Sequence, residues 1–260
     1  MMRALHTAAT GMLAEQTAVD VTAHNLANVN TTGYRRERAE FQDLMYQNLR
    51  TPGGTNGDGS TQPSGLQIGL GVRTVATAQI HTQGAMLQTG NSLDLAIEGD
   101  GFFQVNRPGG ELAYTRAGNL KKDAEGRLVT VDGYEIEPSI TIPDDATSVS
   151  ISPDGTVSVT LANQNQSQQV GQLTLASFAN VGGLLALGRS MFQPTDASGP
   201  ALEAQPGREG VGTIAQGFLE GSNVEVVNEM IDLIASQRAY DINQRVITTS
   251  DEMLRRIADR

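Results

Sequence analysis

The sequence contains no cysteine and no tryptophan, and aromatic residues make up only 4% of its 260 positions. The missing thiols exclude disulfides and thiolate metal sites. The shortage of aromatic rings argues against a stacking surface for sugars or bases. No long apolar run suggests a transmembrane helix, and polar residues interrupt the first sixteen positions, where a secretory signal needs an apolar core. We therefore expect a chain that is cytosolic or that leaves the cell without a cleavable signal peptide.

Positive charge is also scarce, since the formal net charge is −11. This acidity argues against binding to nucleic acid or insertion into an anionic membrane as the main role. The three histidines lack metal-ligand spacing, and we expect His6 and His24 to lie on the surface. Asp94 and Glu98 lie about 13 Å apart on a predicted strand, too far for a glycosidase pair, and we interpret them as solvated strand ends. The sequence predicts no catalytic residues, metal or cofactor.

The C-terminal region is rich in helix-forming residues and has neither proline nor glycine after Gly221. Ser222 and Glu225 have the spacing of a capping box, which predicts that a helix begins there. Its apolar residues recur every seven positions, at Val226, Leu233, Tyr240, Ile247 and Leu254. A second row at the same spacing consists of Met230, Gln237, Gln244, Asp251 and Ala258. A strict heptad repeat predicts a coiled coil with a partner helix.

The N-terminal region supplies a matching pattern. Leu5, Met12, Val19 and Leu26 recur every seven residues, beside a row formed by Ala9, Gln16 and Ala23. We expect this helix to end near Val29, where Asn28 and Gly33 belong to a run of turn-forming residues. The amides in both rows fit either a buried contact that fixes register or a solvated surface, and the sequence leaves both open.

The middle of the chain has the pattern of short antiparallel strands. Predicted strands cover 93–99, 101–105, 112–116, 127–131 and 149–153, followed by runs at 170–178 and 211–219. Four turn sequences separate them: Pro108-Gly109-Gly110, Glu125-Gly126, Asp132-Gly133 and Pro153-Asp154-Gly155. Residues 34–49 are ambiguous between helix and strand, and 51–65 has the composition of a linker.

These patterns predict an α+β fold, in which long N- and C-terminal helices pair as an antiparallel or parallel coiled coil around an inserted all-β domain. The expected domains are a terminal helical domain (1–33 and 221–260), a connector (34–75) containing the segment 51–65, and an all-β outer domain (76–220). Helices with half-polar seams bury little apolar area alone, so we expect them to order on contact with other copies of the chain.

Three motifs resemble one known family. Residues 25–34 (NLANVNTTGY) resemble the N-terminal signature of bacterial flagellar rod and hook proteins. Residues 221–230 (GSNVEVVNEM) and 237–240 (QRAY) resemble its C-terminal signature, and 94–105 (DLAIEGDGFFQV) resembles a central block. Together the motifs cover nearly the whole chain, and residues 41–47 and 63–72 are most similar to distal rod members.

The resemblance implies a structural axial protein of the flagellar basal body that polymerises into a hollow, straight, rigid tube and transmits torque from motor to hook. It implies contacts with copies of itself, proximal rod proteins below, the hook protein above, surrounding ring proteins and the flagellar type III export apparatus. It also implies a periplasm-spanning location, reached as an unfolded chain, and a role for 51–65 in keeping the tube straight. We expect assembly to involve Leu5, Met12, Gln16, Val19, Leu26, Asn25, Asn28, Gly33, Val226, Met230, Leu233, Gln237, Tyr240, Ile247 and Leu254.

Other functions fit the sequence less well. Within the family, the alternatives are a proximal rod protein or a hook-type axial protein. Outside it, a peptidoglycan hydrolase would need an acid–base pair that the sequence does not offer. A binding module that never polymerises would not depend on residues 1–30 or 222–260.

Overall fold

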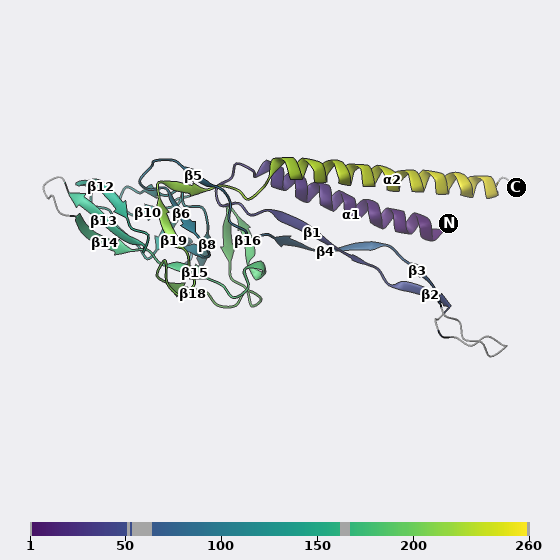
Figure 1. Ribbon diagram of the computed structural model, residues 1–260, viewed down its shortest axis with the longest axis horizontal. Helices are drawn as coiled ribbons and strands as arrows, with labels where there is room; N and C mark the ends of the chain where they lie inside the picture. Colours follow the sequence, from purple (N-terminus) through teal and green to yellow (C-terminus); the bar gives the residue numbers. More distant parts are fainter. Residues whose placement is uncertain (1, 51–52, 54–63, 162–166, 259–260) are drawn as a thin grey trace. The chain divides into compact units, whose positions relative to one another are not determined.

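The computed structural model describes residues 2–50, 53, 64–161 and 167–258. Among these residues, two long helices, α1 (Met2–Ala27) and α2 (Val226–Ala258), stand at the two ends of the sequence, and the regular structure between them consists of short strands and one 3-10 turn, η1 (Val181–Gly183) (Figure 1). This arrangement confirms the predicted α+β class. The chain forms two compact units. The described parts of 1–27, 37–78 and 225–260 make the first, and those of 28–36 and 79–224 make the second.

The two compact units do not correspond directly to the predicted helical domain, connector and outer domain, so that division stays a prediction. In the compact units, the short segment 28–36 is included with the β-rich residues 79–224, whereas the segments on both sides of it belong to the first unit. The chain therefore passes between the units at residues 27–28, 36–37, 78–79 and 224–225.

In the first unit α1 packs against α2, and Figure 1 shows the N- and C-termini at the same end of the pair. The predicted capping box is wrong, because α2 begins at Val226 and Ser222 does not cap it. Ser222 Oγ instead accepts a hydrogen bond of 3.2 Å from the backbone N–H of Val224, within the second unit. At the start of α2, the backbone carbonyl of Glu225 accepts from the N–H of Glu229 at 3.1 Å.

Residues 34–49, which the sequence left ambiguous, contribute two strands rather than a helix. Strand β1 (Glu37–Asp43) pairs with β4 (Val72–Gln79), and β2 (Tyr46–Arg50) pairs with β3 (Leu66–Gly69). Pairing with residues 66–79 decides the conformation, since tertiary contacts override a weak helical period. The predicted linker 51–65 lies outside the described residues, apart from Gly53 and positions 64 and 65.

The second unit is built from antiparallel pairs of short strands. Its largest sheet has the order β16 (Leu185–Gly188), β17 (Met191–Gln193), β8 (Leu112–Thr115), β7 (Phe102–Asn106), β11 (Glu135–Glu137), β10 (Leu128–Val129) and β9 (Lys121–Lys122), with β15 (Leu175–Ser177) and β18 (Leu202–Ala204) attached through β7. The other sheets are β12 (Ala146–Ile151), β13 (Thr156–Leu161) and β14 (Ser167–Gln172); β6 (Leu95–Glu98) with β19 (Thr213–Gln216); and β5 (Met86–Gln88) with β20 (Phe218–Glu220).

The four predicted turns are confirmed by backbone hydrogen bonds that close them. These run from Arg107 to Glu111, from Asp123 to Arg127, from Thr130 to Tyr134 and from Ser152 to Thr156, with N···O distances of 3.0, 3.0, 2.8 and 3.0 Å. Each turn contains a glycine at positive φ, the conformation that other residues adopt only at a cost.

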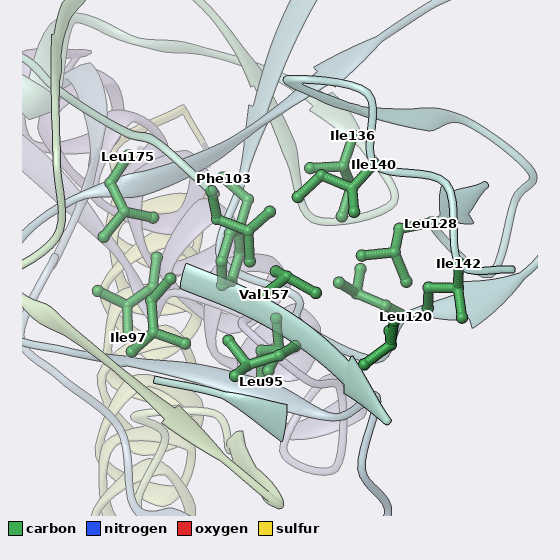
Figure 2. Packing of buried hydrophobic residues seen from close by; sticks show 14 of the residues in the cluster. Leu95, Ile97, Phe103, Leu120, Leu128, Ile136, Ile140, Ile142, Val157 and Leu175 are labelled. Carbon is green, nitrogen blue, oxygen red and sulfur yellow. The ribbon is translucent and has the colours of Figure 1, made fainter. Parts of the chain in front are cut away.

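Side chains from several of these sheets share one hydrophobic core (Figure 2). Leu95 and Ile97 of β6 lie with Phe103 of β7, Val157 of β13 and Leu175 of β15, all without solvent exposure. Burying a side chain of this size contributes about 1.5–3 kcal/mol. This shared core makes the small sheets into one unit.

Candidate assembly interface

The two helices run antiparallel in a defined register. Asn25 Nδ2 donates to Glu229 Oε2 at 3.0 Å near the end of α1. Further along the pair, a Cβ added to Gly11 would lie 2.9 Å from Asn243 Nδ2. From the first contact to the second, the residue number falls by two heptads on α1 and rises by two heptads on α2. This is the relationship expected for an antiparallel pair.

The seam in closest contact consists of small and polar residues. Extending this register along both helices places Ala4, Gly11, Ala18 and Asn25 of α1 opposite Ser250, Asn243, Ser236 and Glu229 of α2. Asn25, Glu229 and Ser250 are buried. The seam on α1 therefore lies one residue away from the apolar row predicted from the heptad pattern.

The residues predicted to act in assembly occupy three kinds of environment. Leu5, Met12, Val19, Leu26, Leu233, Ile247 and Leu254 are half-buried on the two helices, and Asn28, which belongs to the second unit, is also half-buried. Gln16, Val226, Met230, Gln237 and Tyr240 are exposed, and Asn25 and Gly33 are buried. The structure thus partly buries these apolar residues of α1 and α2 and leaves Met230 and Gln237 in solvent. Their roles in assembly stay predictions.

The opposite face of α2 carries an apolar stripe that α1 does not cover. Its exposed members are Val227, Ile231 and Ile234. At about 100° per residue, these positions lie on the side of the helix away from Glu229 and Ser236. Side chains such as Ile231 and Ile234 remain 58% and 47% exposed. A helix that is apolar on two opposite faces has a second face available for a partner.

Asn25 makes three side-chain hydrogen bonds where α1 ends. Its Oδ1 accepts from the backbone N–H of Glu37 at 2.8 Å, and Nδ2 donates to the carbonyl of Glu37 at 2.8 Å as well as to Glu229. One amide therefore joins α1, α2 and the start of β1.

The rest of the N-terminal signature is anchored in the second unit. Gly33 has φ +69°, and its N–H donates to the carbonyl of Glu220 at 2.9 Å. Next to it, the buried guanidinium of Arg35 lies with Nη1 2.8 Å from Glu220 Oε1, and Arg116 Nη1 lies 3.2 Å from the other carboxylate oxygen. In the C-terminal signature, Asn223 accepts from the N–H of Arg36 and donates to the carbonyl of Ile80, both at 2.7 Å. Gly33 of the N-terminal signature and Asn223 of the C-terminal one thus serve the internal structure of the second unit.

His81 lies beside this cluster of charges. Its ring is edge-on to Phe102 and Phe192, with ring centres 6.4 and 6.1 Å away. Burial, and then the charges of Arg35 and Arg116, lower the pKa of His81 from 6.5 to about 4. Burial also lowers the pKa of Arg116, while the charge of Glu220 acts in the opposite direction. His81 is therefore neutral near pH 7, and neither ring nitrogen has a hydrogen-bond partner among the described residues.

Other side chains considered in the sequence are also placed. His6 and His24 are exposed, as predicted. The interpretation of Asp94 as a solvated strand end is wrong, because it is buried and accepts hydrogen bonds from Thr89 and Asn91 at 2.6 and 3.0 Å. Within the described part of the chain, no cluster of three or more histidines or carboxylates could hold a metal ion, and neither helix is apolar enough to span a membrane.

Sequence reasoning missed Glu229, Asn223, Arg35, Arg116 and Glu220. Glu229 and Asn223 lie within the recognised C-terminal signature, and Arg35 immediately follows the N-terminal one. Their position in or next to a recognised signature was the only feature of the sequence that could have singled out these three residues. Nothing in the local sequence of Arg116 or Glu220 distinguishes a buried ion pair from a solvated charge.

Family profiles match three parts of the chain. They are described as Flagella basal body rod protein (residues 5–35), Flagellar hook protein FlgE/F/G D1 domain (96–159) and Flagellar basal body rod FlgEFG protein C-terminal (215–260).

Several relatives match over nearly their whole length. The chain is 51% identical over 253 residues to Flagellar basal-body rod protein FlgG of Agrobacterium fabrum, covering 97% of each chain. The proteins of the same name in Caulobacter vibrioides and Bacillus subtilis are 48% and 41% identical, with at least 97% of each chain covered. A Flagellar hook protein FlgE of Helicobacter mustelae is 39% identical over 53% of this chain but only 30% of its own length. From the motifs and these full-length matches, the chain belongs to the flagellar basal-body rod protein family.

Proposed function

We propose that this chain is a structural subunit of the distal rod of the flagellar basal body, and that copies of it assemble through the uncovered apolar stripe of α2. The full-length relatives named as rod proteins support a structural rather than an enzymatic role. The observation that carries the assembly step is the two-sided character of α2. One face lies on α1, and the opposite face exposes Val227, Ile231 and Ile234.

A second copy of the chain is the occupant that best fits this stripe. The stripe occupies the first part of α2, and Arg238 and Arg245 follow it on the same face, so a purely lipid-like surface is a poor match. Contacts between unlike faces of identical subunits do not close on themselves and generate helical filaments. In such a filament α1 and α2 would pair as an antiparallel coiled coil, and neighbouring copies would cover the outer stripe.

The finer parts of this function follow from the family. The filament is proposed to be a hollow, straight and rigid tube that crosses the periplasm and transmits torque, with 51–65 helping to keep it straight. Its proposed neighbours are proximal rod proteins below, the hook protein above and ring proteins around it. Subunits are proposed to reach it unfolded through the flagellar export apparatus.

A proximal rod or hook-type axial role is the alternative. The hook relative matches only part of its own length, whereas the rod relatives match over almost all of theirs. That difference favours the rod.

The assembly step is tested with Ile231→Glu and Ile234→Glu, made singly and together. Sedimentation velocity at rising concentration and negative-stain electron microscopy measure polymer formation. We expect the parent chain to form straight tubes and the double variant to remain monomeric with unchanged helical circular dichroism. Gln244→Glu, which adds a charge at an exposed position outside the stripe, is the matched control. Tubes formed equally well by the double variant would contradict the proposed interface.

A further inference from the structure

The seam between α1 and α2 is nearly uniform in the stretch that contains Gly11 and Ala18. These residues present little or no side chain, and their counterparts on α2 in this register are Asn243 and Ser236. Sliding one helix past the other by a heptad moves it about 10 Å and again places small residues of α1 opposite polar residues of α2. This part of the seam therefore specifies the register of the two helices weakly.

Asn25 and Glu229 are the exception to this uniformity. Glu229 is 1% exposed, and its Oε2 accepts from Asn25 Nδ2 at 3.0 Å. A slip by one heptad would place Glu229 opposite Ala18, whose methyl group cannot donate a hydrogen bond. Loss of a hydrogen bond to a buried carboxylate is destabilising, so this contact penalises the slipped arrangement.

The same amide is tied to the beginning of β1. Asn25 holds both the N–H and the carbonyl of Glu37 at 2.8 Å, so a shift of α1 relative to β1 would break two further hydrogen bonds. A change of register that moved α1 relative to β1 would therefore disturb the β1–β4 pair as well as the helices.

We propose that Asn25 is the register-determining residue of this helix pair: its amide, shared by Glu229 and the backbone of Glu37, selects one alignment of α1 on α2. Polar residues in helix seams can fix register at a cost in stability. This role belongs to the single chain and does not depend on the proposed polymer.

The absence of native cysteines makes the register directly measurable. In one version of the full-length chain, Ala18→Cys and Ser236→Cys report the native register. In another, Gly11→Cys and Ser236→Cys report a slip of one heptad. Each version is oxidised, and intrachain disulfides are quantified by gel mobility and peptide mass spectrometry. In the parent background we expect only the native pair to cross-link.

The test variant replaces both polar partners, as Asn25→Leu with Glu229→Leu. We expect its slipped cross-link to increase at least tenfold while its helical circular dichroism is retained. Glu229→Gln, which keeps an acceptor for Asn25, should retain the native cross-link alone. Gln16→Leu with Gln237→Leu is the matched control, because both glutamines are exposed.

Three results would overturn the proposal. One is exclusive native cross-linking in the double leucine variant, and another is slipped cross-linking in the parent chain. The third is a loss of helical signal in the double leucine variant, which would show that the polar pair supports stability rather than register.

Discussion

Arg35 Nη1 lies 2.8 Å from Glu220 Oε1, and both side chains are almost completely buried. Arg116 contacts the other oxygen of the same carboxylate, so one buried acid serves two buried guanidinium groups. The N–H of Gly84 also donates to Glu220 Oε1 at 3.0 Å. Because these groups come from four separate parts of the second unit, the carboxylate holds that unit together.

Replacing Glu220 with leucine should destabilise the second unit severely. The change leaves two buried guanidinium groups without their carboxylate, and removing one partner of a buried ion pair typically costs about 3–5 kcal/mol. Urea unfolding followed by circular dichroism measures the loss. Glu40→Leu is the control, since its pair with Arg38 is exposed and such pairs contribute about 0–1 kcal/mol. Equal unfolding midpoints for both variants would contradict this account of Glu220.

Stability should fall as the pH drops from about 6.5 to about 4, in part through His81. Its pKa is about 4 in the folded chain, and we take the ordinary value of 6.5 for the unfolded chain. Between these values the unfolded chain binds a proton that the folded chain excludes, so acid favours unfolding. Below pH 4 both states are protonated and the effect levels off. Above pH 6.5 His81 makes no such contribution.

His81→Phe separates this effect from general acid denaturation. Phenylalanine preserves edge contacts with Phe102 and Phe192 but cannot titrate. Urea midpoints measured at several pH values between 7 and 4 should fall less steeply for this variant than for the parent, whereas the exposed-site control His6→Gln should follow the parent. Parallel curves for His81→Phe and the parent would rule out His81 as a source of the acid sensitivity.

Gly33→Ala should be more damaging than a change that only strains the backbone. A Cβ at Gly33 would lie 2.7 Å from the backbone nitrogen of Ala117, which cannot move aside easily, and φ is +69°. Gly133 has φ +83° but no atom within 4 Å of its added Cβ, so Gly133→Ala isolates the cost of φ, about 1 kcal/mol. Thermal unfolding should therefore give a clearly larger loss for Gly33→Ala. A loss equal to that of Gly133→Ala would mean that the close approach to Ala117 has no energetic effect.

Gly11→Ala should be tolerated, although the helices approach closely at this position. The added methyl would meet the end of the flexible Asn243 side chain, 2.9 Å away, which can rotate aside. Alanine also favours the helix by about 0.8–1 kcal/mol over glycine. We expect unchanged or slightly increased thermal stability for Gly11→Ala, and a clear decrease for the much larger Gly11→Leu. A marked loss for the alanine variant would show that Asn243 is held in place.

The sequence predicts those features that local residue patterns determine. The heptads that include Leu5 and Leu233 predict two helices, and glycine-containing turns such as Asp132-Gly133 predict the hairpins. The coiled-coil pairing was predicted from the same heptads, but the direction of the helix pair was left open.

Contacts between distant residues could not be predicted in this way. The closest helix seam follows Gly11 and Asn25 because small side chains permit close approach, whereas the heptad argument selects the larger apolar residues one position away. The sequence predicted that α2 begins with Ser222 as its cap. This prediction was wrong because Ser222 instead accepts a hydrogen bond within the second unit. The ion pair between Arg35 and Glu220 joins residues far apart in the sequence, so no local pattern predicts it.

The segment 28–36 belongs with residues 79–224, and α1 packs on a helix that begins at Val226. A ribosome releases the N-terminus first, so Arg35 emerges long before Glu220, and α1 long before α2. Neither compact unit can close until nearly the whole polypeptide has been synthesised. This order of emergence delays native structure and prolongs the period in which the nascent chain is open to chaperones or proteases.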